Sequence, residues 1–367
     1  MKAAVLRAVG APLTVEEVDL SGPGPNEVLI RVVASGVCHS DLHVMEGVLP
    51  YPLPTVLGHE AAGVVEDVGP GVSALRRGAH VVVAVVPSCG RCRLCLRGRP
   101  NLCTAIRGRP GVMADGTRRL RLPGGEEVNH FTMISSFAQF AVVHEAAAVP
   151  VREDIPLERA CLLGCGLLTG WGAAVNRARV APGSSCVVLG CGGVGLGIVQ
   201  GCAVRQAEPI VAVDLWPQRL EVAARLGATH TLLAGQEDVP ALVRQLTGGG
   251  ADYVFDAVGS PQTAALALSC LGRGGTAVLV GVGQRDASLS VPITATVLNE
   301  RAVLGCDYGS AWPQRDIALL ADMYAAGRLK LDELVDRTYP LEGVNEALAD
   351  LKEGRALRPV ILPWGDS

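Results

Sequence analysis

The sequence predicts an α/β protein in which a strand-rich segment precedes a doubly wound parallel sheet. Residues 1 to about 150 contain short apolar or alternating runs, such as VLIRVVASGV, that stop at glycine or proline as strands do. From about residue 155 onward, strand-like and helix-like segments alternate, which is the pattern of a parallel sheet with crossover helices. Because 367 residues exceed one ordinary hydrophobic core, we expect two domains.

The alternation can be followed segment by segment. ERACLLGCGLLTGWGAAV predicts a helix, SSCVVLG a buried strand, VGLGIVQGCAVRQ a helix and PIVAVD a second strand. PQRLEVAARLG predicts a helix that ends at Gly227, a favourable C-cap residue. YVFDAVG, AALALSCLGRGG and TAVLVGVG continue the series. Beyond about residue 305 the rhythm stops, and IALLADMYAAGRL and VNEALADLKEG predict amphipathic helices outside the sheet.

The composition excludes several classes of protein. The net charge of −4 indicates no basic surface for nucleic acid or anionic membranes. No apolar run approaches the roughly 20 residues of a membrane span. Glu16 and Glu17 interrupt the N-terminal segment where a signal peptide needs a continuous apolar core. We therefore expect a soluble cytoplasmic protein with no nucleic-acid and no membrane partner.

Four cysteines follow one another at metal-ligand spacing. The pattern is C-x2-C-x2-C-x7-C, formed by Cys89, Cys92, Cys95 and Cys103. Four thiolates can close a tetrahedron around one zinc ion and leave no open position, which is typical of a structural site. An iron–sulfur cluster also uses four cysteines, but its common runs have other spacings. In a reducing compartment disulfides are less favoured than metal binding.

Three further segments together offer a second, open metal site. GVCHSDLH contains Cys38, GHEAAG contains His59, and GCGLLTG contains Cys165. Two thiolates and one imidazole would make a Cys2His site whose fourth position is free for water or substrate. A metal ion there can polarise an alcohol oxygen and lower its pKa.

VVLGCGGVGLG indicates a dinucleotide-binding loop, because its G-x-G-x-x-G pattern follows a predicted strand and begins a predicted helix. The glycines permit a tight turn and a close approach of the pyrophosphate to the helix N-terminus. Asp214 ends the next strand, where a carboxylate binds the ribose hydroxyls and repels a 2′-phosphate, so we expect NAD rather than NADP. The loop residues expected to touch the cofactor are Gly190, Gly192, Gly193, Val194 and Gly195.

In combination these motifs resemble the zinc-dependent medium-chain dehydrogenase family, in particular its alcohol dehydrogenases. The resemblance runs from GPGPNEVLIRV to GRALRPVIL and includes GHEAAGVVEDVG, the four-cysteine segment, GCGLLTG and LGCGGVGLG. It implies a catalytic domain with a GroES-like β-barrel and a structural zinc lobe, formed by residues 1–166 and 308–367. It also implies an NAD-binding Rossmann domain at residues 167–307.

The resemblance also implies the composition of the catalytic zinc site. Cys38, His59 and Cys165 match the zinc ligands. Glu60 matches a nearby carboxylate that can approach the metal when water or product exchanges. Asp41 matches the residue that orients the ligating histidine, a role that metal sites generally need. Two zinc ions per chain are therefore expected.

The resemblance implies further roles in proton transfer and cofactor binding. Ser40 matches the hydroxyl that takes the alcohol proton, and His43 the far end of the relay that passes it to solvent. The cofactor positions that it implies are His39 and Arg358 at the pyrophosphate, Arg219 beside the adenosine ribose, and the backbone of Val280, Gly281 and Val282 at the nicotinamide carboxamide.

The expected activity is reversible oxidation of primary alcohols to aldehydes with NAD. The pocket positions that often carry aromatic residues in alcohol-active relatives are the aliphatic Leu49 and Val85. A roomy apolar pocket selects by shape and buried area, so medium-chain or aromatic alcohols are the expected small-molecule substrates.

Three alternatives stay open. Arg107 matches an arginine that anchors the thiol adduct in formaldehyde-oxidising relatives, which suggests a thiol-dependent formaldehyde dehydrogenase; the accompanying acidic position, however, is Leu49. Polyol dehydrogenases usually carry a carboxylate as the last metal ligand, where this chain has Cys165. A non-catalytic NAD-binding relative is the third alternative.

The segment RAVLGCDYG, near residues 301–309, predicts an apolar strand at the edge of the second sheet. An unpaired apolar edge is an aggregation liability, and in the family this region pairs across a two-fold axis. We therefore expect a homo-oligomer, a homodimer in the first place.

Overall fold

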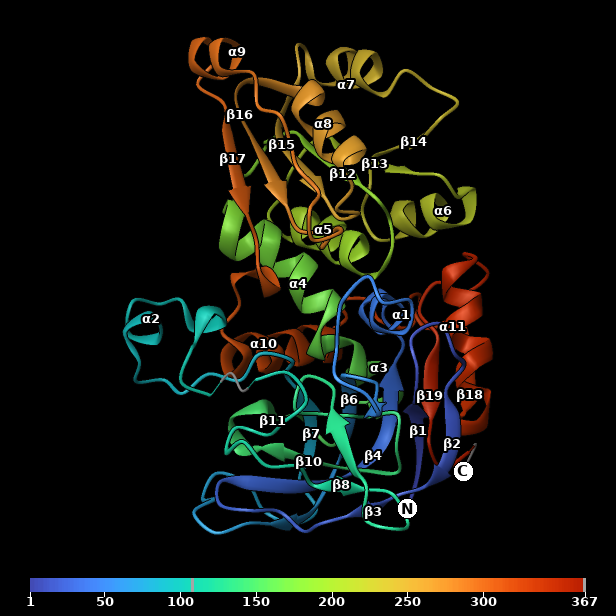
Figure 1. The fold of residues 1–367 in the computed structure, drawn as a ribbon. Coiled ribbons are helices and arrows are strands. Elements are labelled where there is room, and N and C mark those ends of the chain that lie inside the picture. Colours follow the sequence, from blue (N-terminus) through green and yellow to red (C-terminus); the bar gives the residue numbers. More distant parts are fainter. Residues whose placement is uncertain (107–108, 366–367) are drawn as a thin grey trace. The chain divides into compact units, whose positions relative to one another are not determined.

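The computed structural model describes residues 1–106 and 109–365. They form two compact units (Figure 1). Unit 1 comprises Met1–Cys165 and Trp312–Ser367, and unit 2 comprises Gly166–Ala311. The two ends of the chain thus belong to the same unit, and the middle of the chain forms the other.

Unit 1 contains two sheets within the described residues. One has the strand order β2-β1-β5-β9-β8-β3, and the other has the order β11-β7-β6-β4-β19-β18, with β10 also paired to β4. The strands of the first sheet are β1 (Lys2–Leu6), β2 (Thr14–Glu17), β3 (Asp19–Leu20), β5 (Thr55–Val56), β8 (Leu120–Arg121) and β9 (Glu127–His130). Those of the second are β4 (Glu27–Gly36), β6 (Glu60–Val68), β7 (His80–Val83), β10 (Phe140–His144), β11 (Ala148–Pro150), β18 (Thr338–Pro340) and β19 (Val360–Leu362).

Strand β4 lies at the centre of the second sheet because it carries apolar side chains at every second position. Val28, Ile30 and Val32 are fully buried and pack in one hydrophobic cluster with residues of β6, β7 and β10. The alternation has the period of two that places successive side chains on opposite faces of a sheet. The run VLIRVVASGV is therefore a strand, as predicted from the sequence.

Helices complete unit 1. They are α1 (His39–Met45), α2 (Arg93–Leu96), α3 (Leu157–Ala160), α10 (Pro313–Ala325) and α11 (Val344–Lys352). Helix α11 buries Val344, Ala347, Leu348 and Leu351 in a hydrophobic cluster with Leu6 and other residues of the first chain segment. This spacing of three and four residues defines one face of a helix. The predicted amphipathic helices of the C-terminal region are thus present.

Unit 2 is a six-stranded sheet of parallel strands in the order β14-β13-β12-β15-β16-β17, counted over the described chain. The order reverses between β13 and β15, on either side of β12, which is the doubly wound arrangement. The prediction of such a sheet is confirmed. The strands are β12 (Cys186–Leu189), β13 (Ile210–Asp214), β14 (His230–Leu233), β15 (Ala251–Asp256), β16 (Leu271–Leu279) and β17 (Ala302–Gly305).

Helix α4 (Gly166–Gly172), which continues as a π-helix over Ala173–Ala178, precedes the first strand of unit 2. The helices that connect the strands are α5 (Gly193–Val204), α6 (Pro217–Arg225), α7 (Val239–Thr247), α8 (Pro261–Cys270) and α9 (Ile293–Leu298) (Figure 1). Within the described residues, no helix is long and apolar enough to cross a lipid bilayer.

Two segments differ from the sequence prediction. The segment expected as one helix from Glu158 is broken at Cys165, whose φ of −142° and ψ of −84° are not helical. A Cβ at Gly164 would lie 2.4 Å from the carbonyl oxygen of Val83, so packing on β7 dictates the path of the chain there. The edge strand is shorter than RAVLGCDYG, because β17 ends at Gly305.

Candidate functional site

Three strand ends in unit 1 create the first cluster of polar side chains. At the end of β4, Gly36 pairs with Glu60 at the start of β6 and with Val360 at the start of β19. Val37 and Cys38 follow β4, and Val37 N–H donates to the carbonyl of Pro359 at 2.9 Å. Residues distant in sequence therefore meet where the strands β4, β6 and β19 begin or end.

The mixed cluster, as we call it, consists of Cys38, His59, Glu60 and Cys165. One ligand atom from each residue lies within 4.8 Å of the others. The break in the helix at Cys165 places this residue between two helical segments. Two sulfur atoms, one imidazole and one carboxylate are the donor types that zinc binds in proteins.

Asp41 fixes both Cys38 and His59. Its Oδ1 lies 3.3 Å from His59 Nδ1 and accepts a hydrogen bond from Gly58 N–H at 3.0 Å, while Oδ2 accepts from Cys38 N–H at 3.0 Å. Asp41 and His59 are both buried. With Nδ1 held by a carboxylate, Nε2 is the ring nitrogen left to bind a metal.

Glu60, another member of the mixed cluster, forms a buried ion pair with Arg358. Its Oε2 accepts a hydrogen bond from Nη2 of Arg358, and Oε1 has no hydrogen-bond partner in the described chain. A Cβ on Gly36 would lie 2.6 Å from Oε2, so only glycine leaves room for this carboxylate. Burial raises the pKa of Glu60 to about 7, against the opposing effect of Arg358.

The charges of the mixed cluster favour a thiolate. The Cys165 thiol donates to Cys38 and, together with His59, brings the pKa of Cys38 well below its usual value. Burial lowers the pKa of His59, but the Asp41 carboxylate and Cys38 raise it by a larger amount. The pKa of His59 is therefore well above its ordinary value. Positive charge thus stabilises a thiolate here, and a metal cation would do the same for both sulfurs.

Helix α1 carries the residues predicted for proton transfer. The Oγ of Ser40 lies 3.8 Å from Cys38 Sγ. Ser40 and His43 are both partly exposed, and His39 is exposed. Ser40 therefore lies beside the mixed cluster, and His43 lies one turn further along the same helix.

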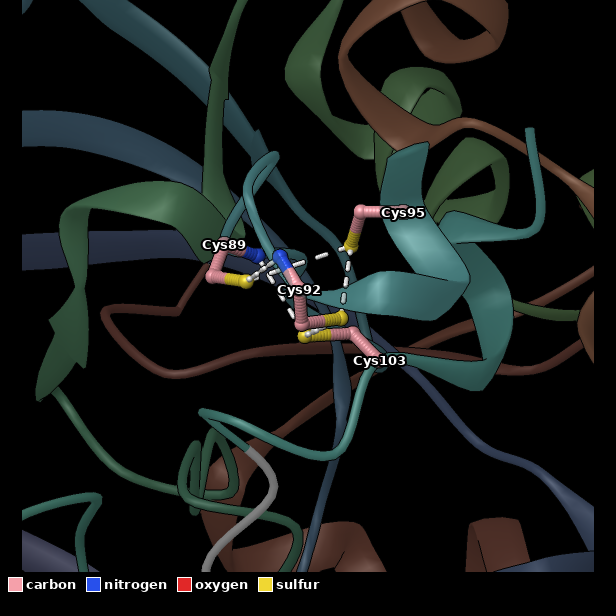
Figure 2. A group of neighbouring side chains, drawn as sticks. All are labelled: Cys89, Cys92, Cys95 and Cys103. Atoms are coloured by element: carbon pink, nitrogen blue, oxygen red, sulfur yellow. Dashed lines mark hydrogen bonds between the residues drawn. The ribbon is translucent and has the colours of Figure 1, made fainter. Parts of the chain in front are cut away.

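The four-cysteine cluster lies elsewhere in unit 1 (Figure 2). Cys92 Sγ lies 3.5 Å from Cys95 Sγ and 4.0 Å from Cys103 Sγ, and Cys89 Sγ lies 4.0 Å from Cys95 Sγ. Zinc–sulfur bonds of about 2.3 Å in a tetrahedron put the sulfurs about 3.8 Å apart. Backbone N–H donors, the first from Cys95, lower the pKa of Cys92 to about 6. Burial, by contrast, raises the pKa of Cys95 to about 12. The sulfur spacing and the lowered pKa of Cys92 fit a zinc ion.

The glycine loop of unit 2 joins β12 to α5. Gly190 has a φ of +87°, and a Cβ on Gly195 would lie 1.7 Å from the Gly190 carbonyl oxygen, so both positions require glycine. Gly192 caps helix α5, which begins at Gly193 and Val194, and no atom would meet a Cβ on Gly192 within 4 Å. First-turn N–H groups without helical acceptors, beside open space, suit a pyrophosphate.

Asp214 is the last residue of β13, and its carboxylate also forms a hydrogen bond with the glycine loop. Its Oδ2 accepts from Cys191 N–H at 2.6 Å and lies 3.9 Å from Arg219 Nη1, and its Oδ1 accepts from Trp216 N–H at 2.9 Å. The Nε of Arg219 is buried without a hydrogen-bond partner in the described chain. An unsatisfied buried donor is costly, so a polar ligand beside Arg219 would stabilise the site.

The remaining predicted positions are placed as follows. Val280 and Gly281 donate their N–H groups to the carbonyl of Asp256, and Val282 is exposed. Leu49 is exposed and Val85 is partly buried. Arg107 lies outside the described residues.

Sequence reasoning did not single out Phe131, which contacts His59 of the mixed cluster, or Tyr51, which contacts Phe131 at 5.1 Å between ring centroids. The Phe131 and His59 rings make an edge-to-face contact with centroids 5.2 Å apart. The segment FTMISSF contains no glycine, proline or asparagine to signal a turn. Only its position after the strand-like EEVNH distinguishes it.

Two family models match the chain. The alcohol dehydrogenase GroES-like domain matches residues 24–153, and the zinc-binding dehydrogenase domain matches residues 193–325. An NDMA-dependent alcohol dehydrogenase of Amycolatopsis methanolica is 42% identical over 374 aligned residues, covering 100% of this chain and 99% of the relative.

Solved structures agree with this relationship. An alcohol dehydrogenase zinc-binding domain protein from Burkholderia ambifaria superposes with a TM-score of 0.94 at 40% identity, over 99% of this chain and 98% of the other. Benzyl alcohol dehydrogenase from Acinetobacter calcoaceticus superposes with a TM-score of 0.93 at 36% identity, over 98% of both chains. The predicted combination of a GroES-like domain with a Rossmann domain is confirmed.

Proposed function

Because the chain belongs to the zinc-type medium-chain alcohol dehydrogenase family, we propose that it interconverts primary alcohols and aldehydes with NAD, using one catalytic and one structural zinc ion. Family membership makes it an oxidoreductase. The observation that carries the finer proposal is the convergence of Cys38, His59 and Cys165, with their donor atoms within 4.8 Å. Thiolate and imidazole ligands with a free fourth position are typical of catalytic zinc.

The mixed cluster would hold the catalytic zinc through Cys38, His59 and Cys165. A zinc ion bound there supplies a Lewis acid that lowers the pKa of an alcohol hydroxyl. Asp41 orients the His59 ring through the 3.3 Å contact at Nδ1. Glu60, whose Oε1 has no hydrogen-bond partner among the described residues, is the carboxylate that would approach the metal when water or product exchanges.

Proton transfer follows helix α1 in this proposal. The Ser40 hydroxyl, 3.8 Å from Cys38 Sγ, accepts the alcohol proton, and partly exposed His43 passes it to solvent. The Ser40 hydroxyl can accept the alcohol proton only if it passes its own proton on, so general base catalysis here needs a relay to solvent. Turnover in the direction of alcohol oxidation should therefore rise toward alkaline pH.

The four-cysteine cluster would hold the structural zinc. Its sulfur–sulfur distances of 3.5–4.0 Å bracket the edge of a zinc tetrahedron. All four positions are then occupied by protein ligands, so the site has no room for substrate. Its contribution is to folding free energy.

We place NAD on unit 2. The N-terminus of α5, with Gly190, Gly192 and Gly195 before and in its first turn, would bind the pyrophosphate. Asp214 would bind the ribose hydroxyls, and its charge disfavours a 2′-phosphate. The other residues that we assign to the cofactor are Gly193, Val194, Arg219, the Val280–Gly281–Val282 backbone, His39 and Arg358.

For the substrate we propose medium-chain and aromatic primary alcohols. Leu49 and Val85 offer apolar surface and no hydrogen-bonding group. An apolar pocket discriminates between alcohols that differ by one methylene by only about 1–3 kcal/mol. We therefore expect the enzyme to accept several alcohols of similar size. The similarity to a benzyl alcohol dehydrogenase supports an aromatic alcohol as one of the substrates.

The proposal is tested by metal content and kinetics on the same preparation. Elemental analysis should give two zinc ions per chain, and NADH formation should be faster with hexanol, octanol and benzyl alcohol than with ethanol or sorbitol. Cys165→Ala should abolish turnover, whereas Cys161→Ala, a nearby buried cysteine outside both clusters, should retain it. One zinc ion or none would contradict the two-site proposal. Formaldehyde oxidation that requires an added thiol would favour the formaldehyde-oxidising branch.

A second candidate follows from the relative whose name specifies NDMA dependence. In this alternative the chain oxidises alcohols with NDMA as co-substrate and shows little turnover with added NAD. Assays with NAD alone, NDMA alone and both together decide between the two. Turnover with NAD alone supports our proposal, and turnover only when NDMA is present supports the alternative.

We further propose that the chain forms a homodimer through α9 and β17. Ile293, Val297 and Leu298 on α9 and Val303 on β17 are exposed apolar side chains. Such an apolar edge is typical of a surface that pairs with another chain. Light scattering at micromolar concentration should report a dimer, and Val297→Asp with Leu298→Asp should shift it to a monomer. A wild-type monomer would contradict this proposal.

A further inference from the structure

Three aromatic rings lie in series behind the mixed cluster. Tyr51 contacts Phe131 with ring centroids 5.1 Å apart and planes at 80°, and Phe131 contacts His59 at 5.2 Å and 86°. Both contacts have the edge-to-face geometry that aromatic quadrupoles favour. Phe131 and His59 are both 1% exposed, so neither ring has free space around it.

The segment that follows Phe131 has an unusual backbone. Thr132, Met133 and Ser135 have φ angles of +52°, +62° and +59°. Left-handed backbone is uncommon for residues other than glycine and is unfavourable for a β-branched residue such as threonine. Conformations of this kind persist where the surroundings fix them and are found at functional sites.

Hydrogen bonds of the Tyr51 and Ser135 side chains fix the backbone around Phe131. The Tyr51 hydroxyl donates to the carbonyl of His130 at 2.9 Å and accepts from Thr132 N–H at 3.1 Å, so it binds the residues on either side of Phe131. Phe131 N–H donates to Ser135 Oγ at 3.0 Å, and Ser135 Oγ donates to the carbonyl of Val56 at 2.8 Å. The position of the Phe131 ring is therefore set from several directions.

We propose that Tyr51 and Phe131 are positioning residues for the ligand His59. Asp41 restrains His59 at Nδ1, but one hydrogen bond leaves the ring free to tilt about that contact. The perpendicular Phe131 ring blocks that tilt, and the Tyr51 hydroxyl keeps Phe131 in place. This inference rests on the proposed function, because it states that Tyr51 and Phe131 orient Nε2 of His59 toward the catalytic zinc.

Packing alone would also bury Phe131, since it lies in a hydrophobic cluster with Leu57 and Phe137. The two roles differ in what they affect. A packing role affects the stability of the whole unit, whereas a positioning role affects one metal site and spares the other. The chain provides its own reference, because the four-cysteine cluster contains neither ring.

The test measures zinc release from the holoenzyme to a chromogenic chelator. The variants are Phe131→Leu, which removes the ring, and Tyr51→Phe, which removes only the hydroxyl. Phe140→Leu is the control, because Phe140 makes an edge-to-face contact with Trp364 at 5.3 Å and 88°, and Trp364, not His59, is its ring partner among the described residues. Variants that lack Cys165 or Cys95 identify which release phase belongs to which site.

We expect Phe131→Leu to release the catalytic zinc about tenfold faster, within the range found for residues behind metal ligands. Tyr51→Phe should have a smaller effect in the same direction, and the structural zinc should leave at the wild-type rate in both. The absorption spectrum of the cobalt-substituted catalytic site should also change in Phe131→Leu and stay unchanged in Phe140→Leu.

Unchanged release and an unchanged cobalt spectrum in Phe131→Leu and Tyr51→Phe would overturn the inference. Equal acceleration in Phe140→Leu would also overturn it, because the effect would then be one of stability. If Phe131→Leu does not fold, Tyr51→Phe decides, since it keeps both rings. A wild type that binds only the structural zinc would instead contradict the proposed function, so the two failures are distinguishable.

Discussion

Arg358 and Glu60 form a buried ion pair although 298 positions separate them in the chain. Strand pairing brings them together, because β6 and β19 flank the end of β4 at Gly36. The guanidinium was expected at the cofactor pyrophosphate. One of its Nη atoms donates to Glu60, and the predicted cofactor contact stays a prediction.

Removal of Arg358 alone should be strongly destabilising. Arg358→Met leaves the Glu60 carboxyl buried without its cation, and breaking a buried pair costs roughly 3–5 kcal/mol as long as the remaining carboxylate stays charged. Because Arg358 lowers the pKa of Glu60, its loss favours protonation of Glu60, so this range is an upper bound. Urea unfolding of holoenzyme measures the loss. The double variant Glu60→Gln with Arg358→Met should recover part of it, because the uncompensated charge is gone. A double variant no more stable than the single one would argue against the pair as the cause.

Asp41→Asn should weaken zinc binding at the mixed cluster, the proposed catalytic site, more than it lowers the stability of the fold. Asparagine retains one acceptor for Cys38 N–H or Gly58 N–H but loses the charge that holds His59 Nδ1. Residues in this position usually contribute 10- to 100-fold to metal affinity, so we expect a loss in that range. Competition with a zinc chelator provides the measurement.

The control for Asp41 is Asp154→Asn, which breaks an exposed pair with Arg152. Solvent screens an exposed pair of this kind, so neither zinc affinity nor stability should change measurably. Equal zinc affinity in Asp41→Asn and wild type would refute the orienting role.

Much of the fold could be predicted from the sequence because its signals are local. The periodicity of VLIRVVASGV predicts a strand, and the glycine pattern before GVGLG predicts the turn and helix that the structure contains. The four cysteines lie within fifteen positions, so their spacing alone indicates that they can meet.

The parts that could not be predicted depend on distant contacts. Nothing near Arg358 in sequence indicates Glu60 as its partner, since β19 reaches β4 only in the folded sheet. The break at Cys165 comes from packing of Gly164 on Val83, whereas the local sequence is apolar and helix-like. The left-handed residues after Phe131 are held by the Tyr51 hydroxyl, which no local pattern reveals.

Substitutions in the two cysteine sets should have different consequences. Cys95→Ser would remove a ligand from the proposed structural zinc site, so unfolding in urea should begin at a lower urea concentration, since structural zinc contributes folding free energy. Cys165→Ser should leave that midpoint closer to wild type and abolish turnover. Zinc content should fall from two to one in each variant. Equal unfolding midpoints with unchanged turnover in both would show that the division of roles is wrong.

Asp214→Asn tests the preference for NAD over NADP more specifically than Asp214→Ala does. The amide oxygen can still accept from Cys191 N–H or Trp216 N–H, so the loop keeps a partner, while the charge that disfavours a 2′-phosphate is lost. We expect the ratio of kcat/KM for NAD to that for NADP to fall at least tenfold. Asp214→Ala should lower both values, because it also removes the acceptor of the loop N–H groups. A wild type that prefers NADP would refute the assignment.

His130 should make the protein sensitive to mild acid. Burial, aided by Arg119 and Arg118, lowers its pKa from 6.5 to about 3, and its Nδ1 has no hydrogen-bond partner in the described chain. Between these values the unfolded chain binds a proton that the folded chain does not. Stability should therefore be unaffected by His130 above about pH 6.5 and fall by up to about 1.4 kcal/mol per pH unit below it.

Urea unfolding between pH 7.5 and 5 measures that slope. His130→Gln retains an acceptor where Nε2 accepts from Arg119 N–H at 2.9 Å, and it cannot take up the proton. Its stability should therefore depend less steeply on pH than that of wild type, whereas His230→Gln, at an exposed position, should match wild type. Because the variants share all other histidines and both metal sites, the difference between slopes isolates His130. Identical slopes for His130→Gln and wild type would mean that His130 is protonated in the folded protein.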